Sequence, residues 1–500
     1  MSKEKVKSFE ISSDEAVGDI VSRDRKANKA KLKVGLLPLA WFEWWPMFEM
    51  SDMETKIKGD ALLFVNRMIE AYGDQYEFIT PEGVVDTLDK AYDAGVKFKE
   101  AGIEALIIDE ATYLTDFIPI EVINHLPPMP IIIFATQATS DLWGDMKNTD
   151  VIRFEGLVGN AQLAGAFKKM GRDYRVVTGA LDNPDSFAML EKHLQVIDLI
   201  KSLQSMDIGL LGHTFRGMYD IEVDKTKIKG VFGPNVLYLD VSHLINIWNT
   251  IRQDEIDDFI RDLERDLPIP MEEVTASDRN ESVKLGLAVK KLIRKFNIDT
   301  LTLLGQHHVE VSTRASADFS FYCAEKDGCM TTHEGDLANL ITKYILNKIS
   351  GKLPVFLEWT AFDQKTDSML LTHHGVVDPQ VHAADLKKCR FTPSPEKWDF
   401  YGQGFSVEYT ARPGQVTLAS IINEQNSWKL LISRGECIER DPAPCYAPQF
   451  FFKHESLAVT DYITKILQEG IAHHICLVYG DYVELLKLYA DYIKLPVVLI

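Results

Sequence analysis

Segments with the period of a β-strand alternate with segments of helical period over the first two thirds of the chain, and this alternation constrains the fold most. Short apolar runs such as KLKVGLLPLAW (31–41), IEALIID and PIIIFATQ are separated by amphipathic stretches long enough to form helices. Such alternation is typical of parallel sheets that carry helices on both faces. After a polar tail at residues 1–30, we therefore expect an N-terminal α/β domain at 31–180 and a central α/β domain at 181–325.

The pattern changes beyond residue 325. After one further helical segment, short β-branched and apolar runs follow one another, and turn signals such as ARPG and DPAP separate them. This pattern predicts antiparallel strands. The expected fold class is α/β, with two Rossmann-like parallel-sheet domains followed by a mainly antiparallel, β-rich C-terminal domain at 326–500. A chain of 500 residues is too long for one core, which agrees with several domains.

The charge of the chain limits its partners. A formal net charge of −20 argues against nucleic acid, because no basic excess is present to neutralise phosphates. The first thirty residues lack the apolar core of a secretory signal, and no run of eighteen apolar residues predicts a membrane span. The six cysteines form no CxxC pair and are expected to be reduced thiols. We therefore expect a cytoplasmic protein that binds neither nucleic acid nor membrane.

Candidate acidic ligands of a metal ion lie between residues 329 and 375. Glu334 and Asp336 open a predicted helix, and Glu358 ends the apolar run PVFL. Each also has a structural interpretation, since acids are common at helix N-termini and at the exposed ends of strands. A carboxylate that is half buried on a strand nevertheless needs a partner or a shifted pKa.

Imidazoles are available from three adjacent pairs. On a strand, neighbouring side chains point to opposite faces, so each pair is expected to supply at most one ligand to one metal. Two carboxylates with two imidazoles favour Mn²⁺, Co²⁺ or Mg²⁺, and an open coordination position lets such an ion polarise substrate oxygens. A core or surface histidine is the structural alternative for any single pair. The pairs are His307–His308, with which no acidic neighbour could be aligned as a second ligand, His373–His374 and His473–His474.

The acidic motifs resemble those of the L-arabinose isomerase and L-fucose isomerase group of metal-dependent aldose–ketose isomerases. The segment from Glu334 to Asn339, EGDLAN, resembles the helix start that carries the first metal carboxylate of that group. Glu358 falls where the arabinose-type enzymes have a second glutamate and the fucose-type enzymes an aspartate. The segment GHTFRGMYDIEVDKTKIKGVFG (212–233) is similar to a central-domain segment with an arginine and an aspartate.

The histidine motifs fit the same group. The run TDSMLLTHH resembles the approach to the first metal histidine, and matching Asp367 to its counterpart favours His373 over His374. The run G-x-A-H-H resembles the closing GGAHH motif, in which the second histidine is the ligand, here His474. The resemblance thus implies a metal site formed by Glu334, Glu358, His373 and His474.

The resemblance also implies a function. It predicts interconversion of an aldose and its ketose through a cis-enediol, with Glu334 and Glu358 as the acid/base pair and Mn²⁺ (or Co²⁺ or Mg²⁺) as cofactor. A hydride shift is the mechanistic alternative. The implied assembly is a homo-oligomer (a trimer, a hexamer or a tetramer) with an inter-subunit active site.

Candidate contacts to the sugar come from several segments. FATQ (134–137) resembles a family segment whose glutamine reaches the sugar, and an aromatic cluster at 41–45 offers a stacking surface, although such a cluster is more often part of a core. For Asp336 the alternatives are a partner of a ligand, a contact to a sugar hydroxyl, or a plain helix cap. The candidate substrate-binding residues are Gln137, Asp336, His374, His473 and Trp44.

Departures from the family pattern affect the identity of the sugar. The first strand ends in PLAWFEWWPMF where the arabinose isomerases have a Gly-Ser-Gln-rich turn, and the spacing from Glu358 to His373 is slightly short. The sequence leaves the sugar, the native metal and the choice of catalytic base open. A non-catalytic sugar-binding protein of the same fold and a metal-dependent sugar lyase are the alternative functions.

Overall fold

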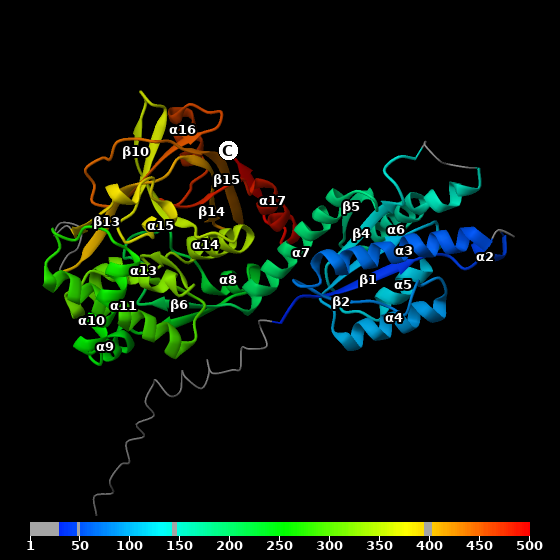
Figure 1. Ribbon diagram of the computed structural model, residues 1–500, viewed down its shortest axis with the longest axis horizontal. Helices are drawn as coiled ribbons and strands as arrows, with labels where there is room; N and C mark the ends of the chain where they lie inside the picture. The colour runs from blue at the N-terminus through cyan, green and yellow to red at the C-terminus, as the bar shows by residue number, and fades with distance from the viewer. Residues whose placement is uncertain (1–29, 48–50, 143–147, 395–402) are drawn as a thin grey trace, which may run out of the picture. The chain divides into compact units, whose positions relative to one another are not determined.

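The computed structural model describes residues 30–47, 51–142, 148–394 and 403–500. The chain forms two compact units, one at Lys26–Asp198 and one that contains Leu199–Ile500. The two units are described separately below and are shown in Figure 1.

The N-terminal unit contains a five-stranded parallel sheet in the order β2-β1-β3-β4-β5. Its central strand β3 is buried along its whole length, as expected for a parallel strand covered on both faces. The strands are β1 (Lys33–Leu39), β2 (Glu77–Ile79), β3 (Ala105–Glu110), β4 (Ile131–Gln137) and β5 (Arg175–Ala180). The helices are α2 (Trp44–Met47), α3 (Ser51–Tyr72), α4 (Leu88–Ala101), α5 (Phe117–Asn124), α6 (Gly156–Met170) and α7 (Pro184–Ser205), of which α7 continues into the second unit.

The second unit begins with a four-stranded parallel sheet in the order β7-β6-β8-β9. Its strands are β6 (Asp207–Leu211), β7 (Asn235–Leu239), β8 (Thr300–Leu303) and β9 (Met330–His333). Its helices are α8 (Lys225–Val231), α9 (Val241–Trp248), α10 (Gln253–Asp266), α11 (Ala276–Phe296), α12 (Glu310–Thr313) and α13 (Asp318–Lys326). β9 belongs to this parallel sheet although it lies just beyond the predicted domain boundary at residue 325. The predicted limits of the three domains stay predictions.

A nine-stranded, mainly antiparallel sheet completes the second unit. Because β16 pairs with both β11 and β15, six strands close into a ring in the order β16-β11-β10-β17-β14-β15. The strands are β10 (Val355–Asp363), β11 (Ser368–Thr372), β12 (Arg390–Pro393), β13 (Phe405–Thr410), β14 (Gly414–Asn423), β15 (Trp428–Cys437), β16 (Pro448–His454), β17 (His474–Tyr479) and β18 (Val497–Leu499). The helices α15 (Pro379–His382), α16 (Val459–Gln468) and α17 (Val483–Tyr492) accompany them. The predicted fold class is confirmed.

Helix α14 (Leu337–Ser350) connects the two sheets of the second unit. It contacts β8 and β9 of the parallel sheet and β10, β14 and β17 of the nine-stranded sheet (Figure 1). Its N-terminus therefore lies where the two sheets meet. Among the described helices, none combines the length and apolar character needed to cross a bilayer.

Candidate metal centre

The turn between β9 and α14 presents Glu334. Glu334 and Gly335 both have left-handed backbone conformations, with φ of 63° and 77°. A Cβ at position 335 would lie 2.6 Å from the Cα of Thr214, so only glycine fits there. The Glu334 N–H donates to the Leu303 carbonyl, and the Phe215 N–H donates to the Glu334 carbonyl, both at 2.9 Å. A non-glycine residue held at positive φ by such contacts is typical of a functional site.

Three adjacent strands bring the other candidate ligands together. Glu358 on β10 lies opposite Thr372 on β11 and opposite His474 on β17. His373 follows Thr372 directly, at the end of β11. Residues far apart in the sequence thus become cross-strand neighbours at one end of the sheet.

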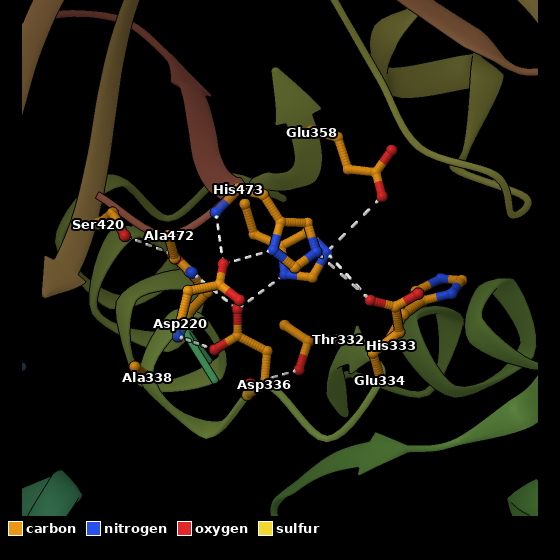
Figure 2. A network of polar contacts seen from close by, with 12 residues as sticks. Asp220, Thr332, His333, Glu334, Asp336, Ala338, Glu358, Ser420, Ala472 and His473 are labelled. Carbon is orange, nitrogen blue, oxygen red and sulfur yellow. Dashed lines mark hydrogen bonds and ion pairs between the residues drawn. The ribbon is translucent and has the colours of Figure 1, made fainter. Parts of the chain in front are cut away.

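The four predicted ligands converge around the His474 imidazole. Its Nε2 atom lies 3.5 Å from Glu334 Oε2 and 3.9 Å from Glu358 Oε1, and Glu358 Oε1 lies 3.7 Å from His373 Nε2. Figure 2 shows the Glu334 and Glu358 carboxylates directed toward the same group of imidazoles. Two sets of three ligand atoms, each within 4.8 Å of one another, share His474. They are Glu334, His473 and His474, and Glu358, His373 and His474.

The residues fit a divalent cation. Glu334 Oε2, His373 Nε2 and His474 Nε2 are buried and find no hydrogen-bond partner among the described residues. Buried polar atoms without partners are costly, and a cation bound between these atoms would satisfy all three. Oxygen and imidazole donors suit Mn²⁺, Co²⁺ or Mg²⁺, in agreement with the sequence-based expectation.

The protonation states also favour ligation. Burial works to raise the pKa of Glu334, but the contact with His473 and the imidazoles of His373 and His474 outweigh burial and lower that pKa to about 2. Burial, together with the neighbouring His374 and His474, lowers the pKa of His373 well below its ordinary value. An ionised carboxylate and a neutral imidazole are the forms that bind a metal.

Each candidate histidine ligand has its second ring nitrogen engaged. His474 Nδ1 lies 2.9 Å from Asp336 Oδ2, and both side chains are fully buried. His373 Nδ1 lies 2.8 Å from the His374 carbonyl oxygen. Such contacts fix the orientation of the ring and leave Nε2 directed at the space between the candidate ligands, where an ion would bind.

Asp336 also caps helix α14. Its Oδ1 accepts from the Asn339 main-chain N–H (2.9 Å), and its Oδ2 accepts from the Asn339 side-chain amide (2.8 Å). Asn339 in turn accepts from the Ser420 hydroxyl on β14 (3.0 Å). This geometry matches two of the roles expected for Asp336, the helix cap and the partner of a ligand.

His374 and His473 border the cluster, and a carboxylate orients each of them. His374 Nδ1 lies 2.7 Å from Asp318 Oδ1. His473 Nδ1 lies 2.6 Å from Asp220 Oδ2, which also accepts from the His473 main-chain N–H (3.0 Å). Burial lowers the pKa of His473, but its contacts with Glu334 and Asp220 outweigh burial and raise that pKa to about 9.

Strand alternation does not separate His473 from His474. The Nε2 atoms of these two histidines lie 3.6 Å and 3.5 Å from Glu334 Oε2. β17 begins at His474, so His473 lies outside the strand and its side chain need not point to the opposite face. Both residues of this pair therefore lie beside Glu334, and the expectation that only one of them serves a metal stays a prediction.

Four polar residues around the cluster were not among the predicted site residues: Asp220, Gln306, Asp318 and the buried His333, which forms a third set of possible ligands with His373 and His374. Gln306 donates from Nε2 to Glu334 Oε1 (2.9 Å). Asp220 lies in the 212–233 segment, which is similar to a family segment with an aspartate, so the sequence contained a pattern that could have identified it. Gln306 and Asp318 lie in segments whose local pattern is that of an ordinary α/β chain, and no motif marked them.

Gln137 and Trp44 belong to the N-terminal unit. Gln137 is the last residue of β4 and donates from its amide to the Thr139 carbonyl (2.8 Å). Trp44 donates from Nε1 to the Tyr113 carbonyl (2.9 Å) and lies beside the Tyr113 ring. Their contact with a sugar, and the contribution of a second subunit to the site, stay predictions.

The fold and the site together define an α/β protein with a carboxylate–imidazole centre between a parallel and an antiparallel sheet. No model of a known protein family matches the chain. The chain is similar to curated proteins named sulfoquinovose isomerase. It is 20% identical to those of Priestia aryabhattai and Priestia megaterium over 426 residues, 81% of this chain and 87% of each relative. It is also 20% identical to that of Alkalicoccus urumqiensis over 357 residues, 69% of this chain and 76% of the relative.

Proposed function

We propose that this protein is a metal-dependent aldose–ketose isomerase. The observation that carries the proposal is the convergence of three buried ligand atoms without hydrogen-bond partners among the described residues: Glu334 Oε2, His373 Nε2 and His474 Nε2. The similarity to sulfoquinovose isomerases along most of the chain supports the same reaction class. The motifs shared with the arabinose and fucose isomerases remain a resemblance that agrees with it.

Glu334, Glu358, His373 and His474 would hold the ion. When bound, a divalent cation polarises neighbouring oxygens of an open-chain sugar and stabilises negative charge on them. Glu334 is suited to be a metal ligand that stays ionised, because its pKa is lowered to about 2 and Gln306 donates a hydrogen bond to its second oxygen. His473 and His374 border the same space and would contact the sugar hydroxyls.

Glu358 is the better candidate for proton transfer at carbon. Its side chain is 37% exposed, whereas that of Glu334 is 6% exposed. Its carboxylate accepts no hydrogen bond within the described part of the chain, so it is free to approach a substrate. In this proposal Glu358 removes the proton from C2 and returns it to C1, while the hydroxyl proton passes from O2 to O1 with help from Glu334 or His473.

The proposed substrate is a sulfonated aldose of the sulfoquinovose type. This assignment rests on the name of the relatives, which specifies such a sugar. With identity at 20%, the residues that would recognise the sulfonate have to be sought in this chain itself.

Exchange of Glu358 for Gln tests the proposal. We expect Glu358→Gln to lose turnover by at least about a thousandfold, because an amide cannot take up the C2 proton. Folding should be unchanged, since the side chain is partly exposed and accepts no hydrogen bond from the described residues, its contacts with His373 and His474 being 3.7 Å and 3.9 Å long. Glu436→Gln, at an exposed position on β15, is the matched control and should keep full activity.

The readouts separate the alternatives. Turnover should require added Mn²⁺, Co²⁺ or Mg²⁺, and one solvent deuterium should appear at C1 of the ketose. Unlabelled product would favour a hydride shift, and a cleaved carbon chain seen by NMR would favour a lyase. A purified protein that holds none of these metals under any condition, or an active Glu358→Gln variant, would contradict the proposal.

A further inference from the structure

The loop at residues 212–220, between β6 and α8, contacts the candidate centre at two points. Phe215 donates its N–H to the Glu334 carbonyl (2.9 Å), and the last residue, Asp220, contacts His473 through its carboxylate. Thr214 packs against Gly335, where there is no room for a Cβ. Side chains of this loop therefore lie next to the space in which a sugar would bind.

A histidine pair stands beside this loop. His213 Nε2 lies 3.1 Å from His308 Nε2, and the rings meet edge to face. His213 Nδ1 lies 2.6 Å from the Thr214 carbonyl, which fixes the His213 ring. His308 lies in a π-helical turn (Gly305–Val309), two residues from Gln306, which donates to Glu334, so the pair adjoins the centre from two separate segments of the chain.

The same loop carries an arginine that has no acidic partner. Arg216 is exposed, and no described residue forms a hydrogen bond or an ion pair with it. Among the other arginines of the second unit, Arg261, Arg265 and Arg434 pair with carboxylates, whereas the exposed Arg314 and Arg412 pair with no carboxylate of the described residues. In a chain with a net charge of −20, an arginine left without an acidic partner beside a candidate site is informative.

Two adjoining hollows share His213 and Tyr238. One, with a volume of about 300 Å³, is lined by His213, Arg216, Lys225 and Tyr238, and the other, of about 500 Å³, by His213, Tyr238 and His308. The acids on their walls are already engaged, because Glu222 pairs with Lys225 and Asp240 caps α9. The donors that remain available are the guanidinium of Arg216 and the second ring nitrogen of His308; both ring nitrogens of His213 are engaged, so His213 lines the hollows and orients His308.

We propose that Arg216, His213 and His308 form a subsite for the anionic substituent of the sugar. The guanidinium presents several N–H donors in one plane, a geometry that matches the oxygens of a sulfonate, phosphate or carboxylate. The name of the relatives favours sulfonate among these three. The inference rests on the proposed function, since it places the acidic end of the same sugar whose C1 and C2 lie at the candidate centre.

The test compares one sugar with and without its charge. We expect Arg216→Gln to raise the KM for sulfoquinovose by about tenfold or more, with kcat changed little, because the lost contacts act on binding. The KM for quinovose, which lacks the sulfonate, should stay the same. Glucose 6-phosphate and glucuronate report whether phosphate or carboxylate is accepted instead. His308→Gln should have a smaller effect in the same direction.

A binding measurement separates this inference from the isomerase proposal. The alditol of sulfoquinovose cannot isomerise, and its calorimetric affinity for the full-length protein should fall in Arg216→Gln and stay unchanged in the control Arg265→Gln. If the alditol binds and its binding depends on Arg216, but no aldose is turned over, the subsite is supported and the isomerase proposal is overturned. Absence of alditol binding to the wild-type protein, or equal losses for sulfoquinovose and quinovose in Arg216→Gln, would overturn the subsite.

Discussion

At the residue level, the candidate centre consists of imidazoles whose orientation is set by carboxylates and carbonyls outside it. Asp336 engages His474, Asp318 engages His374, and the His374 carbonyl engages His373. Because the partner of each ring is buried or part of the main chain, the nitrogen facing the centre is not free to turn away. Mutations of such partners are therefore expected to affect function more than folding.

Asp220 is the sharpest case, because it engages His473 twice. We expect Asp220→Asn to lower kcat by roughly tenfold to a hundredfold, since His473 loses the anion that orients it. The pKa of His473 should fall below about 9, because one of the two carboxylates that raise it is removed. NMR titration of His473 and the pH profile of kcat measure both effects. The exposed Asp257→Asn on α10 is the control, and an Asp220→Asn variant with an unchanged pH profile would contradict this role.

At the level of elements, the turn between β9 and α14 has two functions. It fixes Glu334 through positive φ angles, and it starts the helix that contacts both sheets. Asp336 takes part in both, as the cap of α14 and as the partner of His474.

Two substitutions of Asp336 should separate these functions. Asp336→Asn keeps the Oδ1 acceptor that caps α14, but its amide nitrogen replaces the Oδ2 atom that accepts from Asn339 and contacts His474. We therefore expect a smaller loss of unfolding free energy than with Ala, and Mn²⁺ binding weakened by roughly tenfold to a hundredfold. Asp336→Ala should weaken Mn²⁺ binding by the same factor. It should also lower the free energy of unfolding by about 1 kcal/mol or more, because it removes the helix cap. Urea unfolding of the metal-free protein and calorimetric Mn²⁺ titration measure the two quantities. Asp224→Asn, at the exposed cap of α8, should leave both unchanged.

At the level of the whole molecule, we expect pH to change the stability of the N-terminal unit. In the N-terminal unit, Asp109 at the end of β3 is fully buried beside Thr136 and Glu110. Burial raises the pKa of Asp109 to about 7, the Thr136 hydrogen bond opposes this, and the Asp60 carboxylate adds to it. Burial also raises the pKa of Glu110.

The stability of the N-terminal unit should therefore decrease as pH rises toward neutrality. Between the unfolded pKa near 3.9 and the folded value near 7, the folded state binds more protons than the unfolded state, so raising the pH favours unfolding. From pH 5.5 to 7 the loss due to Asp109 should be about 2 kcal/mol. Hydrogen exchange of the β3 and β4 amides measures it. Asp109→Asn should make the stability of this unit depend less on pH, whereas the control Asp93→Asn, at an exposed position, should not. An equal slope of stability against pH in the wild-type protein and both variants would refute the assignment to Asp109.

Much of the fold and part of the site followed from the sequence. The alternation of strands and helices predicted the parallel sheets, and the β-branched runs predicted the antiparallel sheet, because side-chain period is a local property of the chain. The same runs placed His373 at the end of a strand, whereas Glu358, predicted to close its apolar run, lies inside β10, which continues to Asp363. The resemblance of EGDLAN and G-x-A-H-H to known motifs added Glu334 and His474, which the structure brings within 3.5 Å of each other.

The tertiary structure alone decided which distant segments meet. Pairing of β10 with β17 joins residues more than a hundred positions apart, and β16 closes the six strands by pairing with both β11 and β15; no local period encodes such pairings. For the same reason Asp220, Gln306 and Asp318 could not be assigned from their surroundings in the sequence, nor could Arg216 and His308 be placed beside the candidate centre. The sequence by itself determined which residues can bind a cation, while packing of α14 against two sheets determined that they face one another.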